Sequence, residues 1–319
     1  TDALNMKGVS EYSKVKNIDL TAFLAGHDIL IISNDISKGI NSILKAYKSG
    51  KVSEKRLSYS VKKVLKAKYK VGLNKYIPVD LNNLYDDLNT IEDESLNYEA
   101  VGSSLTLLNN NNLIPLKSKS NIGHIILGDD SGKAFEKQLR KYHYIEKVNN
   151  VKAINVLEKT ASLDTIIISF HRSNSTPWKA SNFSNEEIEI ISKVAESKTL
   201  ILDIFVKPYA ISALKSINGI DALLLSYQNS KTSQILSADA IFGAQKINGS
   251  LPVDIIESFN EGDGIALKNI HRMGFASPES LGFDSNKLEN VDELAQISID
   301  SMMTPGMRIL VSRKGKILF

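Results

Sequence analysis

Four short apolar runs alternate with stretches of helical periodicity, and this pattern constrains the fold of the 319-residue chain more than any other feature. The apolar runs occupy residues 122–127, 165–170, 200–206 and 222–227, and the helical stretches occupy residues 133–141, 185–196, 209–216 and 232–242. Strands that are apolar on both faces and alternate with helices are typical of a parallel sheet covered on both sides. The sequence therefore predicts a complete α/β domain over residues 95–257.

The residues before this domain contain too few elements for a domain of their own. Residues 29–33 form a continuous apolar run, which predicts a buried strand, and helices are expected at about residues 37–47 and 53–71. One strand and two helices indicate the closing part of a parallel β/α structure over residues 1–73. Residues 74–94, rich in Asn, Asp and Tyr, are expected to form a linker.

The end of the chain shows a similar lack of elements. Residues 258–280 are interpreted as a second linker, and residues 281–319 contain one amphipathic helix, at about residues 285–303, and a terminal hairpin. A free hairpin has no core of its own. We therefore expect both ends of this sequence to be interior points of longer domains.

Composition excludes several classes of function. The 39 Lys and Arg residues nearly balance the 36 Asp and Glu residues, and only six of the basic residues are arginine. Nucleic-acid binding proteins favour clustered arginine with interleaved aromatic residues, so a nucleic-acid partner is not expected. The absence of cysteine excludes a thiolate nucleophile. No apolar run approaches the roughly 18 residues of a membrane-spanning helix, and no glycine-rich phosphate loop is present.

Several strings, taken in order, resemble glycoside hydrolase family 3 in its β-N-acetylglucosaminidase branch. Residues 1–9 (TDALNMKGV) resemble a family segment in which the Asp is the catalytic nucleophile at the end of the seventh barrel strand. Residues 22–30 (AFLAGHDIL) resemble the passage into the last barrel strand, and residues 50–73 the final helix. Later strings resemble landmarks of the family's second domain, at residues 104–116, 207–210, 242–243 and 248–253. The resemblance implies the C-terminal end of a (β/α)8 TIM barrel followed by an α/β sandwich domain with a mostly parallel sheet.

The resemblance also implies roles for individual residues. Asp2 is expected to be the nucleophile of a retaining glycosidase, whose two catalytic groups generally lie about 5 to 5.5 Å apart. Met6 is expected to line the sugar pocket, and His171 to contact substrate from the second domain. The acid/base of this branch, a histidine assisted by an aspartate, would precede Thr1, so this chain alone is expected to be inactive. His27 is interpreted as structural.

Residues 281–319 resemble a second family instead of glycoside hydrolase family 3. Residues 281–284 (LGFD), the helix that follows and residues 305–315 resemble the opening of serine β-lactamase and penicillin-binding-type domains. The Ser-x-x-Lys signature of that fold occurs in four places, all before this region, and is interpreted as chance there. Its nucleophile is expected beyond Phe319. The four matches begin at Ser13, Ser42, Ser60 and Ser212.

Together these features predict a retaining glycoside hydrolase that removes terminal N-acetylglucosamine from peptidoglycan- or chitin-type glycans. The expected partner is a carbohydrate, and neither a metal nor an organic cofactor is expected, since His124, His143 and His271 have no partners at metal-ligand spacing. A cell-wall substrate implies a periplasmic or cell-surface parent protein. Two alternatives stay open: a non-catalytic binding or scaffold module, and a serine β-lactamase or esterase activity as the main activity of the parent protein.

Overall fold

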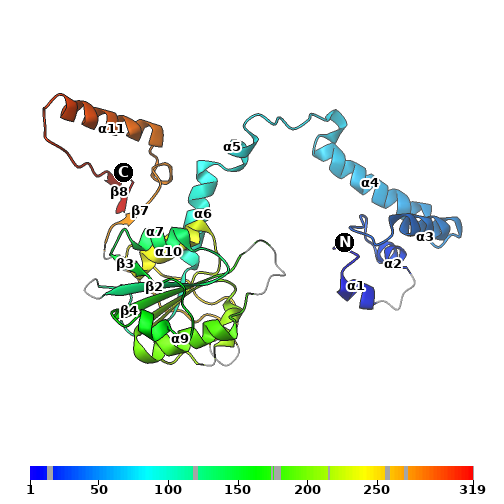
Figure 1. Ribbon diagram of the computed structural model, residues 1–319. Coiled ribbons are helices and arrows are strands. Elements are labelled where there is room, and N and C mark those ends of the chain that lie inside the picture. Colours follow the sequence, from blue (N-terminus) through cyan, green and yellow to red (C-terminus); the bar gives the residue numbers. More distant parts are fainter. Residues whose placement is uncertain are drawn as a thin grey trace. The chain divides into compact units, whose positions relative to one another are not determined.

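The computed structural model describes residues 1–12, 17–117, 121–173, 175, 181–214, 216–255, 259–268 and 272–318. The chain divides into two compact units, Thr1–Leu84 and Tyr85–Phe319 (Figure 1). The division falls inside the range that we interpreted as a linker. The predicted subdivision of the second unit at residues 258–280 stays a prediction. His271 and the first Ser-x-x-Lys match, at residues 13–16, lie outside the described residues, and so does Lys215 of the fourth match.

The first unit consists of short helices whose ends carry the expected signals. The helices are α1 (Lys7–Tyr12), α2 (Ile18–Leu24), α3 (Ile36–Lys48), α4 (Glu54–Lys70) and the 3-10 helix η1 (Leu73–Lys75). The side chain of Ser53 caps α4 by accepting from the N–H of Arg56. Gly72 ends the same helix with φ of 81°, a conformation that favours glycine. The predicted positions of α3 and α4 are confirmed to within one or two residues.

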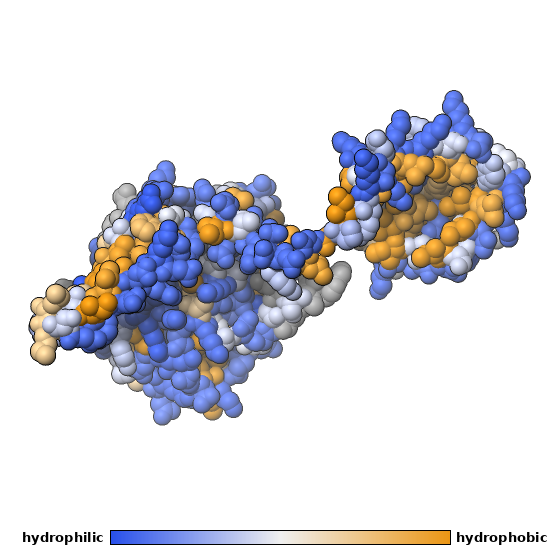
Figure 2. Space-filling model, turned by 90° about the horizontal axis from the view of Figure 1, so that it is seen from above, coloured by the Kyte–Doolittle hydropathy of each residue, from blue (hydrophilic) through white to orange (hydrophobic). Residues whose placement is uncertain are grey.

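The predicted buried strand of the first unit is wrong. Residues 29–33 contribute a single parallel bridge, between Ala3 and Ile31. Ile29 is 56% exposed and Ile32 60% exposed. A strand is buried on both faces only where neighbouring strands and helices cover it, and the described part of this unit offers one bridging segment and a small core. That core consists of Phe23, Ala46 and Val52. Figure 2 shows hydrophobic side chains gathered on the surface of this unit.

The second unit is built on a six-stranded sheet whose order is β1-β6-β5-β4-β2-β3. All neighbours are parallel except β1, which pairs antiparallel with β6. This confirms the predicted parallel sheet. Sequence analysis named four of its strands and missed β1 and β3. The strands are β1 (Thr106–Asn110), β2 (Ile122–Gly128), β3 (Ile145–Lys147), β4 (Thr165–His171), β5 (Thr199–Phe205) and β6 (Ala222–Leu225).

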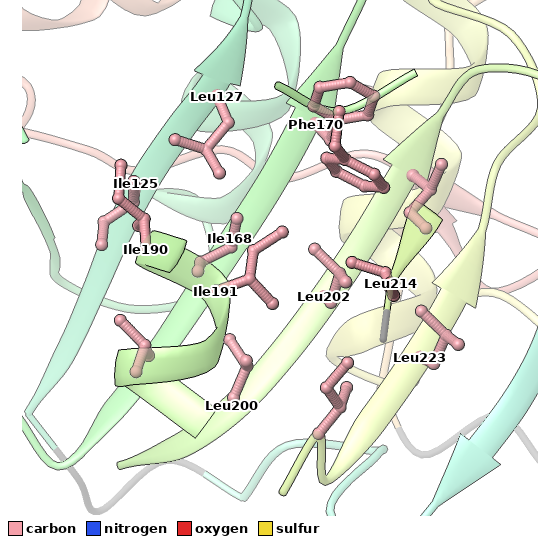
Figure 3. Packing of buried hydrophobic residues seen from close by; sticks show 14 of the residues in the cluster. Ile125, Leu127, Ile168, Phe170, Ile190, Ile191, Leu200, Leu202, Leu214 and Leu223 are labelled. Atoms are coloured by element: carbon pink, nitrogen blue, oxygen red, sulfur yellow. The ribbon is translucent and has the colours of Figure 1, made fainter. Parts of the chain in front are cut away.

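Helices cover both faces of this sheet, and successive strand residues alternate between two cores. Ile168 of β4 and Leu202 of β5 pack with Ile190 and Ile191 on one face (Figure 3), while Ile167 belongs to the core on the other. These helices are α6 (Ile91–Ser104), α7 (Lys133–Leu139), α8 (Val156–Lys159), α9 (Asn185–Ser197) and α10 (Lys231–Ile241). Helix α5 (Leu84–Leu88), at the boundary between the two units, contains no buried residue. The helix expected at residues 209–216 is instead the 3-10 helix η2 (Pro208–Ala213).

The last part of the second unit is a small sheet and an exposed helix. The elements are β7 (Gly274–Phe275), η3 (Glu279–Leu281), α11 (Ser285–Asp300), β8 (Ser312–Arg313) and β9 (Lys316–Ile317). The predicted hairpin is confirmed, and β9 also pairs in parallel with β7. Lys316 Nζ donates to the carbonyl of Ala244 at 3.1 Å, which ties the hairpin to the α/β domain. The resemblance of residues 281–319 to a β-lactamase-type domain stays a prediction.

Candidate functional site

Asp2 lies on an extended segment that pairs in parallel with the chain around Ile31. Ala3 and Ile31 form the bridge, and the N–H of Leu4 donates to the carbonyl of Ile31 at 2.9 Å. The Asp2 side chain is exposed, and its Oδ1 accepts from the N–H of Ala3 at 2.8 Å. A local hydrogen bond thus holds one carboxylate oxygen while the group stays open to solvent, an arrangement compatible with nucleophilic attack.

A hollow of about 340 Å³ opens beside this segment. Asp2 and Leu4 form one part of its wall, and α2 with the residues after it, ending at His27, forms another. The structure therefore brings Asp2 and His27 to one hollow, which sequence analysis did not predict. Met6 is not among the lining residues and is 50% exposed. Its predicted contact with a sugar stays a prediction.

The loop that carries His27 is held by charges around Asp28. Lys63 Nζ donates to Asp28 Oδ2 at 2.6 Å, and Ser60 Oγ donates to Oδ1 at 2.6 Å. Arg56 Nη1 donates to the same Oδ1 at 3.2 Å, and Nη2 donates to the carbonyl of His27 at 3.1 Å. The hydrogen bonds from Lys63 and Ser60 hold the pKa of Asp28 well below its ordinary value. Side chains of α4 thereby fix the loop that borders the hollow.

Sequence analysis gave no structural role to the residues that bind Asp28. Arg56, Ser60 and Lys63 are separated by four and three positions, which places them on one face of a helix. That spacing predicts a shared polar face, but water can satisfy such a face, so the sequence does not identify Asp28 as its partner. Ser60 and Lys63 also form one of the Ser-x-x-Lys matches, and the structure places both on the Asp28 carboxylate.

His171 ends β4 at the carboxyl edge of the sheet, where open α/β sheets bind ligands. The structure buries its side chain completely. The imidazole stacks on Phe205 with ring centroids 4.4 Å apart, and Nδ1 lies 2.8 Å from Asn229 Oδ1. Burial lowers the pKa of His171 to about 4, so the ring is neutral at pH 7. Its predicted contact with substrate stays a prediction, and the described residues give it no route to solvent.

Polar groups at this edge connect the buried ring to the surface. Asn229 Nδ2 donates to Asp130 Oδ2 at 2.8 Å, and Asp130 is exposed. The edge lies between β2 and β4, the point where the strand order reverses. Gly128 is required there, because a Cβ at that position would lie 1.8 Å from the carbonyl oxygen of His171. Asn229 therefore links the buried His171 ring to the exposed Asp130 carboxylate by hydrogen bonds.

Two further titratable groups lie inside the sheet of the second unit. Asp203 of β5 accepts hydrogen bonds from Ser226 Oγ at 2.8 Å and from Ser237 Oγ. Burial raises the pKa of Asp203 to about 7. His124 Nε2 lies 2.7 Å from Ser169 Oγ, and burial lowers the pKa of His124 to about 3. Both are enclosed, so we assign them to the packing of the domain. Across the described ranges, no three His, Asp or Glu side chains gather as metal ligands would.

Comparisons with known proteins give the fold a context. No protein-family model matches the chain. A periplasmic β-glucosidase/β-xylosidase of Dickeya chrysanthemi is 34% identical over 80 residues, which is 25% of this chain and 12% of that protein. A glycoside hydrolase family 3 β-N-acetylglucosaminidase from Paenibacillus sp. str. FPU-7 superposes with a TM-score of 0.60 and 20% identity, over 80% of this chain and 50% of that one. A β-glucosidase from Listeria innocua gives 0.62 and 20%, over 78% and 40%.

These likenesses extend beyond one unit, because four-fifths of the chain is more than either unit holds alone. The chain spans half or less of the length of these solved structures. No helix among the described residues combines the length and the apolar character needed to cross a membrane. Over most of its length the chain has a mixed α/β fold with a parallel-rich sheet, similar to the fold of glycoside hydrolase family 3 enzymes.

Proposed function

We propose that this chain is part of a retaining glycoside hydrolase of family 3 that removes terminal N-acetylglucosamine from peptidoglycan- or chitin-type glycans. The observation that carries the proposal is the Asp2 carboxylate, which is exposed, lines a hollow and lies next to the parallel bridge between Ala3 and Ile31. In β/α barrels the catalytic groups lie at the C-terminal ends of the parallel strands. The fold shared with the β-N-acetylglucosaminidase supports the same proposal.

In the proposed mechanism Asp2 attacks the anomeric carbon of the terminal sugar. An acid protonates the glycosidic oxygen as its bond to that carbon breaks, and a glycosyl ester of Asp2 forms. The group that acted as the acid, now a base, takes a proton from water. The water oxygen attacks the anomeric carbon, the ester bond to Asp2 breaks, and the Asp2 carboxylate is freed. Two inversions at one carbon give overall retention of configuration.

The acid/base is a separate part of the proposal. By resemblance it is a histidine with an aspartate partner in a segment that precedes Thr1, and this chain alone should then lack turnover. His27 is the one histidine that shares the hollow with Asp2 among the described residues. The acid/base is therefore either a histidine upstream of Thr1 or His27, and a variant distinguishes the two. If the acid/base lies upstream, His27→Asn should leave turnover by a longer polypeptide intact.

The test is hydrolysis of an aryl N-acetylglucosaminide by this chain and by a polypeptide that extends it upstream. The longer polypeptide should turn the substrate over, and Asp2→Asn should reduce kcat by about 10³-fold or more, because the covalent step loses its nucleophile. Asp80→Asn, an exposed aspartate of the same unit, is the matched control and should change kcat little. Binding of the sugar without turnover by the longer polypeptide would favour the scaffold function and contradict the proposal. Turnover by the present chain at the rate of the longer one would contradict the external acid/base.

A second proposal concerns residues 281–319. We infer, from their resemblance, that they open a serine β-lactamase-type domain of the parent protein. The supporting observation is α11, which contains no buried residue and exposes Leu294 and Ile297, as a helix does when its packing partner lies elsewhere. A downstream sequence with Ser-x-x-Lys and Tyr-x-Asn would support this proposal, and a downstream sequence with neither would contradict it.

A further inference from the structure

A cavity of about 410 Å³ lies in the second unit, and neither Asp2 nor His171 lines it. Its walls come from α6, from α10, from the end of α7 and from residues 275–280. The cavity is within the size range of small-molecule sites, which begins at about 300 Å³. None of the residues that we place at the candidate functional site lines it.

The walls of the cavity are held in place by hydrogen bonds. Tyr98 OH donates to the carbonyl of Phe275 at 3.1 Å, which fastens the end of β7 to α6. Gln138 is almost fully buried, and its Nε2 donates to Asp239 Oδ1 at 2.6 Å. Tyr142 OH donates to the same oxygen at 2.6 Å. The cavity is therefore preformed, which lowers the entropic cost of binding.

The cavity carries an excess of positive charge. Lys141 and Lys231 line it, against the single carboxylate of Glu94. Within the described residues neither lysine forms an ion pair, and Lys141 Nζ lies 4.1 Å from the ring centroid of Phe275. Partial burial lowers the pKa of Lys141, and the charge of the nearby Asp239 acts in the opposite direction. A ligand that carries one negative charge would balance the charges of the side chains that line the cavity.

The remaining walls offer hydrogen bonds rather than a purely apolar surface. The amide of Asn97 and the hydroxyls of Thr232, Ser277 and Ser280 line the cavity and can both donate and accept. Glu94 adds a strong acceptor for hydroxyl groups. An inorganic anion would use the lysines and leave these groups unused, and a neutral sugar would use these groups and leave the lysines unpaired.

We propose that this cavity binds a hydroxylated organic anion of sugar size, either a sugar acid or a sugar phosphate. Lys141 and Lys231 hold the carboxylate or phosphate, and the amide, hydroxyl and Glu94 side chains bind the hydroxyl groups. The site is independent of the proposed glycosidase chemistry. Asp2→Asn should therefore leave binding here unchanged, so the two proposals can fail separately.

The test is calorimetric titration of the full 319-residue chain with gluconate, glucose 6-phosphate, glucose and inorganic phosphate at low ionic strength. At least one of the two sugar anions should bind about tenfold or more tightly than glucose, and also than inorganic phosphate. The tighter of the two identifies the anionic group. Binding of glucose or phosphate as tightly as either sugar anion, or no binding of a sugar anion at millimolar concentration, would overturn the proposal.

Variants locate the site. Lys141→Met and Lys231→Met keep the aliphatic stems and remove the charge, and each should weaken binding of the tighter anion about tenfold. Lys152→Met, an exposed lysine that does not line the cavity, is the matched control and should bind as the parent chain does. Circular dichroism separates loss of folding from loss of charge. Folded lysine variants that bind with unchanged affinity would overturn the assignment.

Discussion

Helices α3 and α9 have the same length of 13 residues and the same kind of N-terminal cap, yet their apolar faces have different environments. In α9, Ile190 and Ile191 are almost fully buried against the sheet. In α3, Ile40 and Leu44 are exposed. Local sequence therefore determines that both helices form and where they begin, whereas burial depends on what the rest of the unit places beside them.

The two units differ in the same way at the level of strands. In the second unit every interior strand has neighbours on both sides, and the side chains of β4 and β5 are buried with few exceptions. In the first unit the apolar run 29–33 has a single bridging residue as neighbour. The difference shows why one unit holds a closed core and the other a small cluster of three buried side chains.

Ile190→Ala should give the largest loss of stability. Ile190 is 2% exposed and packs in the core on one face of the sheet (Figure 3). Its truncation removes apolar contacts and leaves a cavity, so the free energy of unfolding of the second unit should fall by about 2–5 kcal/mol. Chemical denaturation followed by circular dichroism measures this. A loss below about 0.5 kcal/mol, as for a surface site, would contradict the closed core.

The pH dependence of stability should differ between carboxylates of the two units. Burial raises the pKa of Asp203 to about 7, above the ordinary value of 3.8. The folded state therefore binds the proton more tightly, and the stability from protonated Asp203 is present below pH 4 and lost as pH rises through 7. In the parent chain the free energy of unfolding should fall by up to about 4 kcal/mol as pH rises through this range. Asp203→Asn should abolish that fall, because the amide imitates the neutral acid and does not titrate. Denaturation midpoints between pH 4 and 8 measure it.

Asp28→Asn is the control from the first unit, and its effect has the opposite sign. The pKa of Asp28 is held low by Lys63, Ser60 and Arg56. The stability from its ionised form is present above the ordinary pKa and lost as pH falls below it. His171, whose folded-state pKa is lowered to about 4, also loses its contribution as pH falls from 6.5. An Asp203→Asn variant with the same pH slope as the parent chain would show that the buried carboxylate is not protonated in the folded state.

Sequence patterns predicted the second unit better than the first for a physical reason. Strands β2, β4, β5 and β6 are continuous apolar runs. This pattern predicts both that they are strands and that both of their faces are buried. Strand β3 has only three residues and only Ile145 buried, which leaves almost no pattern to detect. Residues 29–33 carry the pattern of a buried strand without its partners, so the pattern alone gives the wrong burial.

The candidate site was predictable only in part. Asp2 stands in a family-like string, and the structure gives it exposure and a hollow. The place of His27 beside that hollow depends on Arg56 and on the Asp28 network, contacts between residues about 30 positions apart. His171 was singled out from its place after a strand, a pattern that identifies the edge of the sheet. Whether such a side chain points to solvent or into the core depends on packing with Phe205, which strand periodicity does not report.

Ile40→Ala should have the smallest effect and is the sharpest test of the comparison. Ile40 occupies the apolar face of α3, as Ile190 does in α9, and it is 62% exposed. Alanine also has a higher helix propensity than isoleucine, so the stability of the first unit should change by less than about 0.5 kcal/mol. Hydrogen exchange of the α3 amides, which reports this unit alone, measures the change. A loss of 2 kcal/mol or more, as in a core, would show that the face of α3 is covered in solution, and that the two helices differ less than their burial in the structure indicates.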